Sequence, residues 1–223
     1  MIHILYALLS RKDYENSLES QLRAFPVQFQ QRVLQFRRWQ DTQATIYGRL
    51  LLKKGLLDYY DLRINWNQIT TDKYGRPFFK GIPLDFNITH SGNIVICAIS
   101  DTKRVGIDIE AINEIDIEDF HDQMTRNELK HIQSHDNPIQ AFYEYWTQKE
   151  AVLKANGGGL SVPLKSFEVI KNEALLYKDR WYVIRLPIHQ EYSCHIASDR
   201  PSNYIIAHVE PPELNSPNTS QNE

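Results

Sequence analysis

Hydrophobic residues recur with helical spacing over the first part of this chain. Between residues 20 and 57 they return every three or four positions, as at Phe29 and Val33 and again from Ile46 on. This spacing is typical of amphipathic helices. Asp41 stands between the two groups as a candidate N-cap, so the pattern predicts two helices in this stretch.

Apolar and polar residues alternate in other segments and predict strands there. The stretch DFNITHSGNIVICAIS alternates on both sides of Ser91-Gly92, as in a β-hairpin, and VGIDIE follows as a further strand. Residues 116–133 and 138–156 return to helical spacing, and 167–210 contains several short strand-like runs. The N-terminal run MIHILYALL lacks the basic region and the cleavage site of a signal peptide and predicts a first strand.

The order of these segments predicts an α+β fold of two similar α/β halves. Helical segments and a set of strands occur once before residue 105 and once after it. We therefore expect an N-terminal subdomain at 1–104 and a C-terminal subdomain at 105–210. Residues 211–223 contain no aromatic residue and no apolar periodicity, which predicts a disordered tail.

The composition argues against several classes of partner. The chain has 223 residues, 42% of them hydrophobic, and a net charge of −3, which predicts a buried core and no general attraction to nucleic acid. No segment approaches the ~20 apolar residues that a membrane-spanning helix needs. The two cysteines, Cys97 and Cys194, are few for a chain of this size, so we expect a reduced, cytoplasmic protein.

The motif VGIDIE places two carboxylates on one face of a strand. Asp108 and Glu110 are two positions apart and project to the same side, while Ile107 and Ile109 face the core. Neighbouring carboxylates repel each other unless a cation lies between them. Mg²⁺ suits such a pair, because it binds carboxylates and completes its shell with waters and phosphate oxygens. A solvent-exposed pair on a sheet surface is the alternative interpretation.

A second chemical cluster lies in YEYWTQKEAVLKANGGGL, which predicts a helix ending at Gly157. Glu150 and Lys154 are four residues apart and share one face, with Lys149 beside them. An ordinary ion pair between Glu150 and Lys154 is the alternative interpretation. The glycines are not followed by G-K-[ST], so they do not form a Walker phosphate loop.

The adjacent residues His90 and Ser91 invite a comparison with serine hydrolases. Neighbours in a strand point to opposite faces, however, and the chain has no G-x-S-x-G elbow there. His90 is therefore a candidate contact to a phosphate or hydroxyl, or else a structural histidine.

Taken together and in this order, KYGRP, FNITHSG, VGIDIE and WTQKEAVLK, followed by GGGLSVPL, resemble the motif set of the Sfp-type 4′-phosphopantetheinyl transferases. The resemblance implies two similar α/β subdomains related by a pseudo-twofold axis, with the active site between them. It implies an enzyme, a holo-carrier-protein synthase. The reaction would move the 4′-phosphopantetheine arm of coenzyme A to a serine of an acyl or peptidyl carrier protein and release 3′,5′-ADP.

The resemblance also implies roles for the carboxylates and lysines. Asp108, Glu110 and Glu150 would hold Mg²⁺, with Mn²⁺ as the alternative ion. Glu150 is equally a candidate base for the serine proton, and the sequence leaves both roles open. Lys154 would contact the pyrophosphate or stabilise the leaving phosphate. Lys149 joins the catalytic set without a defined role.

Coenzyme A would be the co-substrate, and the resemblance implies two groups of contacts to it. One group lines the adenine pocket and the other contacts the phosphates: Tyr74, Gly75, Arg76 and Pro77 for the first, and Thr89, His90 and Lys154 for the second. Family members often carry cations for the 3′-phosphate where this chain has Gln28, Gln31 and Ala44. Arg37, Arg38 or Arg49 could replace them, and the sequence leaves this open.

The implied partner is a carrier protein, usually an acidic helical bundle. Lys130 and Lys165, with Phe120 and Met124, are candidates for its docking surface. We expect no nucleic-acid or membrane partner, and a monomer, because both halves are present in one chain. A Mg²⁺-dependent hydrolase of nucleotide pyrophosphates and a non-catalytic carrier-binding paralogue are the alternatives. The sequence does not indicate which carrier protein is used.

Overall fold

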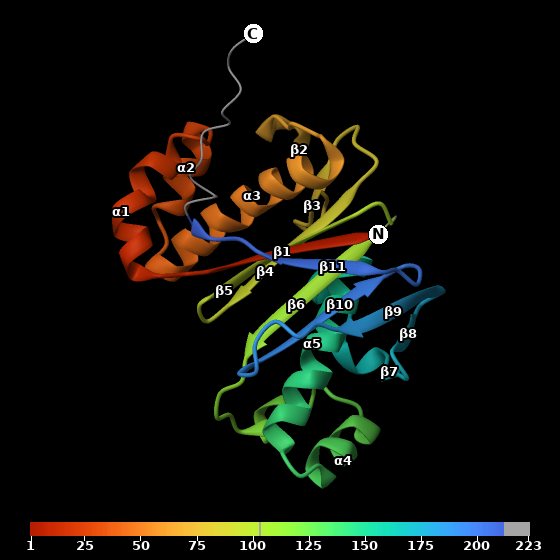
Figure 1. Cartoon of the computed structure of the whole chain (residues 1–223). Helices are drawn as coiled ribbons and strands as arrows, with labels where there is room; N and C mark the ends of the chain where they lie inside the picture. Colours follow the sequence, from red (N-terminus) through yellow and green to blue (C-terminus); the bar gives the residue numbers. More distant parts are fainter. Residues whose placement is uncertain (103, 212–223) are drawn as a thin grey trace.

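The structure is a computed structural model that describes residues 1–102 and 104–211. Its first half has helices over a sheet (Figure 1). In chain order, the elements of this half are β1 (Ile2–Leu8), α1 (Arg11–Leu22), α2 (Val27–Val33), α3 (Trp39–Tyr60), β2 (Ile69–Thr71), β3 (Pro77–Phe79), β4 (Asp85–Ser91) and β5 (Ile94–Ser100). Apart from Pro211, the predicted tail at 211–223 lies outside the described residues.

The second half contains two helices and most of a second sheet. In chain order, its elements are β6 (Val105–Ala111), α4 (Arg126–Ser134), α5 (Pro138–Asn156), β7 (Val169–Ile170), β8 (Glu173–Leu176), β9 (Asp179–Arg185), β10 (Tyr192–Ser198) and β11 (Tyr204–His208). The predicted α+β class is confirmed. The described residues contain no helix that is both long and apolar enough to cross a membrane.

The two helices predicted between residues 20 and 57 are confirmed as α2 and α3, and α1 is a further helix before them. The predicted N-cap is wrong, because Asp41 lies inside the first turn of α3, whose N-cap is Arg38. The hydrophobic pattern does not predict α1, because most residues of this helix are polar. Ser10 begins this helix by accepting a hydrogen bond from the backbone N–H of Asp13.

Other local predictions are confirmed. β4 and β5 form the hairpin around Gly92, whose φ of 53° suits the turn, and VGIDIE forms β6. α5 ends at Gly157, which has the left-handed φ of 83°. The helix expected at 116–133 is instead a short 3₁₀ turn followed by α4.

The strands form two main sheets, with orders β11-β1-β5-β4 and β6-β10-β9-β8-β7, and a small β2-β3 pair. The last strand, β11, returns to pair in parallel with β1 and so completes the first sheet. A strand from the expected C-terminal subdomain therefore belongs to the N-terminal sheet. The division at residue 104 and the pseudo-twofold axis stay predictions.

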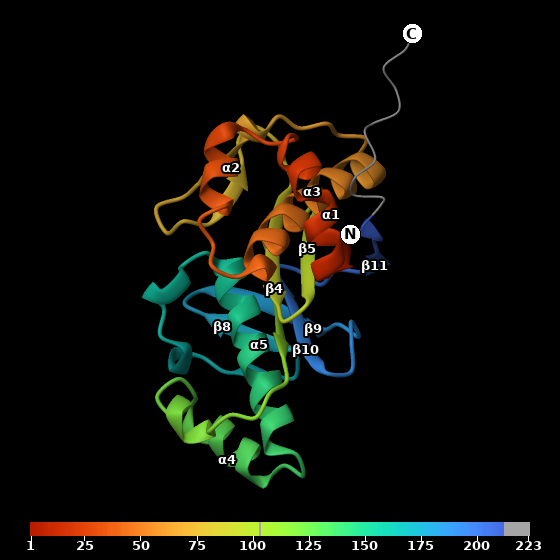
Figure 2. The same cartoon turned by 90° about the vertical axis from the view of Figure 1, so that its left-hand side faces the viewer.

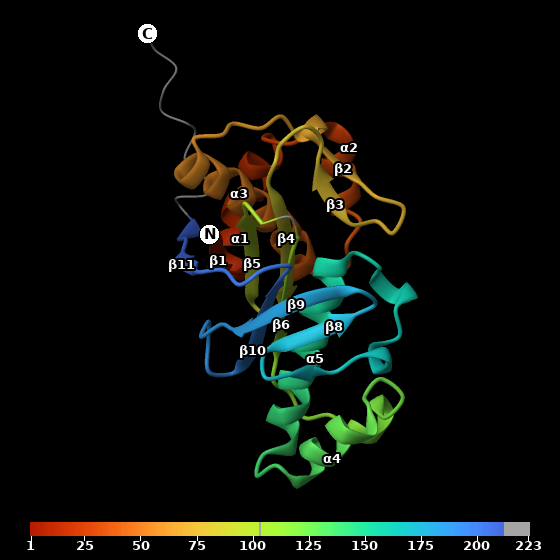
Figure 3. The same cartoon turned by 90° about the vertical axis from the view of Figure 1, so that its right-hand side faces the viewer.

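Each sheet is covered by one long helix. α3 packs on β1 and β5, and α5 packs on β6 and β10. α1, α2 and α3 lie at one end of the molecule and α4 at the other (Figure 2). The opposite faces of the two sheets share a core that includes Ile4, Ile96, Ile107 and Ile196. The second sheet faces the viewer in Figure 3.

Side chains, rather than a backbone ladder, join the edge strands β4 and β6 of the two sheets. Alternate residues of β4 accept hydrogen bonds from alternate backbone N–H groups of β6. These bonds are Asp85 Oδ2 from Val105 at 2.8 Å, Asn87 Oδ1 from Ile107 at 2.9 Å and Ser91 Oγ from Ala111 at 3.1 Å. They satisfy otherwise unpaired edge groups and fix the register of the two halves at the VGIDIE strand.

Candidate active site

Asp108 and Glu110 project from β6 toward α5. Residues two apart on a strand share a face, and this face is the one that α5 covers. Gly106 permits the close approach, because a Cβ there would lie 2.2 Å from the backbone oxygen of Ala151 and the backbone nitrogen of Ala155. The small residue at the start of VGIDIE therefore brings α5 to the carboxylates.

Lys154 reaches across from α5 to this strand. Its Nζ donates to Asp108 Oδ1 at 2.5 Å and to Thr89 Oγ1 at 3.0 Å. The Lys154 side chain is 30% exposed, whereas the Asp108 side chain is 4% exposed. Among the described residues Glu150 and Lys154 form no ion pair, so the simple helix-surface interpretation of their spacing is wrong.

The carboxylates keep unused oxygen atoms. Asp108 Oδ2 is buried and has no hydrogen-bond partner in the described part of the chain. Glu110 Oε2 accepts a hydrogen bond from Ser91 Oγ at 2.8 Å. Glu150 makes no hydrogen bond to any described residue. An orphaned buried oxygen is costly, which points to a ligand at Asp108.

Burial raises the pKa of all three carboxylates, and repulsion from Asp108 adds to this for Glu110 and Glu150. For Asp108, desolvation raises the pKa and the Lys154 ammonium opposes it. For Glu110, desolvation and the charge of Asp108 raise the pKa, and the hydrogen bond from Ser91 opposes them. The pKa of Glu150 is raised by desolvation and then by Asp108. A cation bound among these groups would reverse the shifts.

The three carboxylates fit Mg²⁺ in donor type and charge. Oxygen donors and few protein ligands are what this ion prefers, and Asp108 Oδ2 is free to bind it. The side chains do not form a preformed metal site. Within the described residues, no group of three or more His, Cys, Asp or Glu lies close enough to hold an ion. Asp108, Glu110 and Glu150 as metal ligands stay a prediction.

A pocket of about 280 Å³ opens beside this cluster. It brings together the residues expected around adenine, one residue expected at the phosphates and one expected metal ligand or base: Tyr74, Gly75, Arg76 and Pro77, then Lys154, then Glu150. Asn87, Leu153, Gly157 and Gly159 complete the lining. The KYGRP turn and the C-terminal part of α5 thus form one cavity, although 78 residues separate Arg76 from Lys154.

Arg76 holds this pocket together. Its guanidinium makes a two-pronged pair with Asp85, at 3.0 and 2.6 Å, and donates to the backbone oxygens of Lys154 and Val105, both at 2.9 Å. The side chain is 7% exposed. Its donors are therefore engaged in joining the turn, both halves and α5, and the planar fork suits this task better than a lysine would.

Thr89 and His90 lie on opposite sides of β4. Thr89 is buried against Lys154, and His90 is exposed. Partial desolvation lowers the pKa of His90, while Asp41 raises it and Lys154 and Arg38 lower it. Of the candidate replacements for the 3′-phosphate cations, Arg38 is therefore the one that acts on His90.

The other positions discussed for the 3′-phosphate supply no cation here. Ala44 is fully buried in the first core, and Gln28 and Gln31 are exposed. Arg49 lies over the rings of Phe29 and Trp66 at 5.3 and 5.9 Å, so its charge is directed into the first half's aromatic cluster.

Lys149 corrects the expected catalytic set. Its side chain is 0% exposed, and Nζ donates to both oxygens of Glu128, at 2.7 and 2.6 Å, and to the backbone oxygen of Phe167 at 2.8 Å. All three ammonium donors are satisfied away from Asp108. Lys149 ties α4 to α5 and has no donor left for a substrate.

Of the residues suggested for carrier docking, the two apolar ones are packed against other side chains of the protein and the two lysines are exposed. Met124 is 3% exposed, and Phe120 packs against Phe142 and Trp146, so neither offers a free apolar anchor. Lys130 is exposed, and Lys165 lies 3.6 Å from Asp122. The docking surface stays a prediction that rests on the two lysines.

Comparisons with known proteins match both halves of the chain. A family model described as "4′-phosphopantetheinyl transferase, N-terminal" matches residues 12–102, and one described as "4′-phosphopantetheinyl transferase superfamily" matches residues 104–209. These two matches define the class to which the fold and the carboxylate site belong.

Named relatives place the chain within that class. It is 33% identical over 187 residues to 4′-phosphopantetheinyl transferase psf-1 of Bacillus pumilus, covering 82% of this chain and 77% of that protein. It is 35% identical to 4′-phosphopantetheinyl transferase gsp of Aneurinibacillus migulanus, over 67% of this chain and 64% of that protein. For 4′-phosphopantetheinyl transferase Sfp of Bacillus subtilis the identity is 34%, over 66% and 65%.

The chain belongs to the 4′-phosphopantetheinyl transferase superfamily, as its four motifs predict. It spans just under two thirds of the length of the gsp and Sfp proteins.

Proposed function

We propose that this protein transfers the 4′-phosphopantetheine group of coenzyme A to a serine of an acyl or peptidyl carrier protein and releases 3′,5′-ADP. The observation that carries the proposal is the cluster at the joint of the two halves. There Asp108, Glu110, Glu150 and Lys154 meet beside the pocket lined by the KYGRP turn. This arrangement suits a nucleoside diphosphate group, with the diphosphate at the cluster and the nucleoside in the pocket.

The serine oxygen forms a phosphoester bond to the phosphorus that carries pantetheine. The bond from that phosphorus to the bridging oxygen breaks, and the bridging oxygen leaves as part of 3′,5′-ADP. Such a transfer needs positioning, charge neutralisation and removal of the serine proton. Mg²⁺ held by Asp108, Glu110 and Glu150 would supply neutralisation of the pyrophosphate oxygens. Lys154, at the rim of the pocket, would donate to the oxygen of the leaving 3′,5′-ADP.

Glu150 has the properties of a general base as well. Its pKa is raised by desolvation and by Asp108, and it makes no hydrogen bond with a described residue, so its carboxylate is available to a serine hydroxyl. Metal ligand and base are both compatible with its place on the pocket wall. The monomeric state, the cytoplasmic location and Mn²⁺ as an alternative ion stay predictions.

The test is intact-mass spectrometry of apo carrier proteins incubated with coenzyme A, Mg²⁺ and this protein. We expect one phosphopantetheine group to be added to a carrier serine, and a chelator to stop the addition. Several unrelated acyl and peptidyl carriers should be tried, because the residues of the site do not indicate which carrier protein binds.

The matched variants are Asp108→Asn and Asp179→Asn. Asp108→Asn keeps the side-chain shape but removes the charge beside Lys154, and should reduce transfer by about two orders of magnitude. Asp179→Asn makes the same change at an exposed position at the start of β9 and should keep kcat. Release of pantetheine phosphate without any carrier modification would indicate a pyrophosphate hydrolase. Binding without either reaction would indicate a non-catalytic paralogue.

A further inference from the structure

A buried polar network lies directly behind the carboxylate cluster. On β10, Ser193 and His195 stand opposite Glu110 and Asp108 of β6. Residues that pair across antiparallel strands point to the same face, so all four side chains face α5. Ser193 is 1% exposed and His195 is 3% exposed. The proposed transfer assigns these two residues no part.

Thr147 of α5 is the centre of this network. Its Oγ1 lies 2.7 Å from the backbone oxygen of Tyr143, 2.8 Å from Ser193 Oγ and 2.8 Å from His195 Nδ1. Thr147 is 0% exposed and stands one turn before Glu150. It is therefore the side chain that attaches the middle of α5 to β10.

The donors and acceptors of the network can be assigned completely. A threonine hydroxyl has one hydrogen, which goes to the backbone oxygen of Tyr143. Thr147 Oγ1 then accepts from Ser193 Oγ–H and from His195 Nδ1–H. His195 Nε2 is left as an acceptor, and Gln148 Nε2 lies 3.4 Å from it. In this assignment each donor hydrogen has one acceptor, and the imidazole is neutral.

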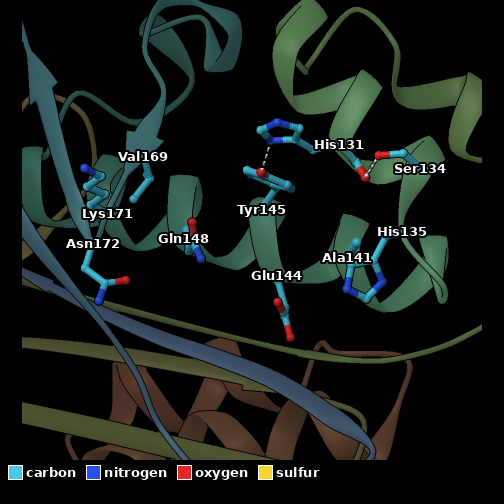
Figure 4. A pocket seen from close by; sticks show the side chains of 10 residues that line it. All are labelled: His131, Ser134, His135, Ala141, Glu144, Tyr145, Gln148, Val169, Lys171 and Asn172. Atoms are coloured by element: carbon cyan, nitrogen blue, oxygen red, sulfur yellow. Dashed lines mark hydrogen bonds between the residues drawn. The ribbon is translucent and has the colours of Figure 1, made fainter.

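The outer end of the network reaches a second cavity. Gln148 lines a cavity of about 440 Å³ between α4, α5 and the turn after β7, together with Glu144 and Tyr145 (Figure 4). His131 donates or accepts a hydrogen bond with the Tyr145 hydroxyl at 3.0 Å there. Asp108, Glu110 and Glu150 do not line this cavity, so it is distinct from the pocket beside the carboxylates.

We infer that Thr147, Ser193 and His195 are positioning residues of the proposed transfer: they fix the rotation of α5 on the second sheet so that Glu150 and Lys154 face Asp108. α5 has no other polar attachment to β10 among the described residues apart from the contact of Gln148 with His195. Gly106 allows the helix to approach, and the Thr147 network sets which of its faces meets the carboxylates. The inference rests on the proposed function, because it concerns the same reaction.

Two substitutions at Thr147 separate positioning from packing. Thr147→Val keeps the shape of the side chain but removes its hydroxyl, whereas Thr147→Ser keeps the hydroxyl. We expect Thr147→Val to lower kcat at least tenfold while the KM for coenzyme A stays within twofold, and Thr147→Ser to restore kcat to within threefold of the unaltered protein.

The matched control is Thr102→Val. Thr102 is 2% exposed, and its Oγ1 also bonds a serine hydroxyl, of Ser100 at 2.9 Å, and a backbone oxygen, of Arg104 at 3.1 Å. It lies between β5 and β6, and its side-chain hydrogen bonds go to residues outside α5. The control should lose stability as Thr147→Val does, yet keep kcat. If Thr147→Val keeps kcat within twofold, or Thr102→Val loses as much, the inference is overturned.

A second pair covers the case in which Thr147→Val does not fold. His195→Asn retains an N–H donor near the place of Nδ1, and His195→Leu has none. We expect the asparagine variant to keep most of kcat and the leucine variant to lose it, and equal kcat in both would overturn the inference. If the unaltered protein transfers nothing to any carrier, the proposed function fails instead, so the two failures are distinguishable.

Discussion

At the scale of residues, alternate side chains of β4 set the geometry of the carboxylates on β6. The polar positions of DFNITHS, two apart, predict one polar face, and this face is the one that meets β6. Sequence alone does not indicate that these side chains bond the backbone of a second strand. Ser91, set aside as a nucleophile, holds Glu110 instead.

Ser91→Ala tests this support of Glu110. The change removes the donor to Glu110 Oε2 and the acceptor for the backbone N–H of Ala111. We expect a loss of about 1–2 kcal/mol in the free energy of unfolding and a fall in kcat, because Glu110 loses its only hydrogen bond from β4. Urea unfolding and the carrier assay measure the two effects. Ser198 is the last residue of β10, and its buried hydroxyl donates to the backbone oxygen of Arg200. Ser198→Ala should lower stability but leave kcat unchanged.

His195 gives a prediction for acid stability. Burial, and then the charge of Arg185, lower its pKa to about 3 from the ordinary 6.5. Below pH 6.5 the unfolded chain therefore takes up a proton that the folded protein does not. The free energy of unfolding should fall by about 1.4 kcal/mol per pH unit from this residue alone, down to its folded pKa.

His195→Asn should remove that part of the slope between pH 6 and pH 4, as measured by urea unfolding at each pH. His121→Asn, which changes an exposed histidine, should leave the slope as it is. If His195→Asn leaves the slope unchanged, His195 is protonated in the folded protein and the donor assignment of its network is wrong.

Lys149 shows why residue roles were harder to predict than motifs. Its neighbour Glu150 lines the pocket, but adjacent helical residues point about 100° apart. The partner of Lys149 is Glu128, 21 positions earlier, and only the packing of α4 on α5 brings them together. Spacing within one helix contains no information about a partner on another helix.

At the scale of elements, the contact of α5 with β6 carries the site. The helix, its glycine end and the strand were all predictable from local patterns, because each is strongly periodic or capped. α1 was not, because its apolar residues are few, and the return of β11 to β1 was not, because a short strand has no signal for its partner. Which strands pair is therefore determined by tertiary packing, and the periodicity of the sequence does not predict it.

Gly106→Ala tests the close approach of α5. The added methyl would lie 2.2 Å from two backbone atoms of the helix, which cannot rotate away. We expect a loss of about 1–3 kcal/mol in stability, and a larger loss of kcat, because α5 must move away from the carboxylates. Thermal unfolding and the transfer assay measure these effects.

Gly81→Ala is the control for that substitution. Gly81 has a φ of 80° with open space around it, so a side chain there strains the backbone without displacing a helix. The control should lose about 1–2 kcal/mol of stability and retain kcat. Full activity of Gly106→Ala would mean that α5 tolerates a shift on β6 and that the spacing does not set the site.

At the scale of the whole molecule, the two halves meet where negative charges gather. β4 and β6 are joined by side chains, and Asp108, Glu110 and Glu150 lie at that joint, where Lys154 forms an ion pair with Asp108. Each carboxylate there has a raised pKa because of desolvation. A cation bound at this joint would favour the charged forms of these carboxylates, and Mg²⁺ is the ion proposed there.

Glu150→Gln tests how much Glu150 contributes to the repulsion at the joint and to Mg²⁺ binding there. Removing one unpaired negative charge should raise the melting temperature in chelator, because less repulsion remains beside Asp108. Mg²⁺ at ten times its Kd should stabilise the unaltered protein by about 1.4 kcal/mol. If Glu150 is a metal ligand, the variant loses most of this Mg²⁺-dependent shift together with kcat.

The same titration decides the role that the sequence leaves open. A Glu150→Gln variant that keeps the full Mg²⁺ shift but loses kcat would identify Glu150 as the base for the serine proton, and not as a ligand. Glu118→Gln, which removes an exposed charge from the turn before α4, should change neither the melting temperature in chelator nor the shift. No Mg²⁺ shift in the unaltered protein would contradict the metal site itself, because a site that binds only the folded state must raise its stability.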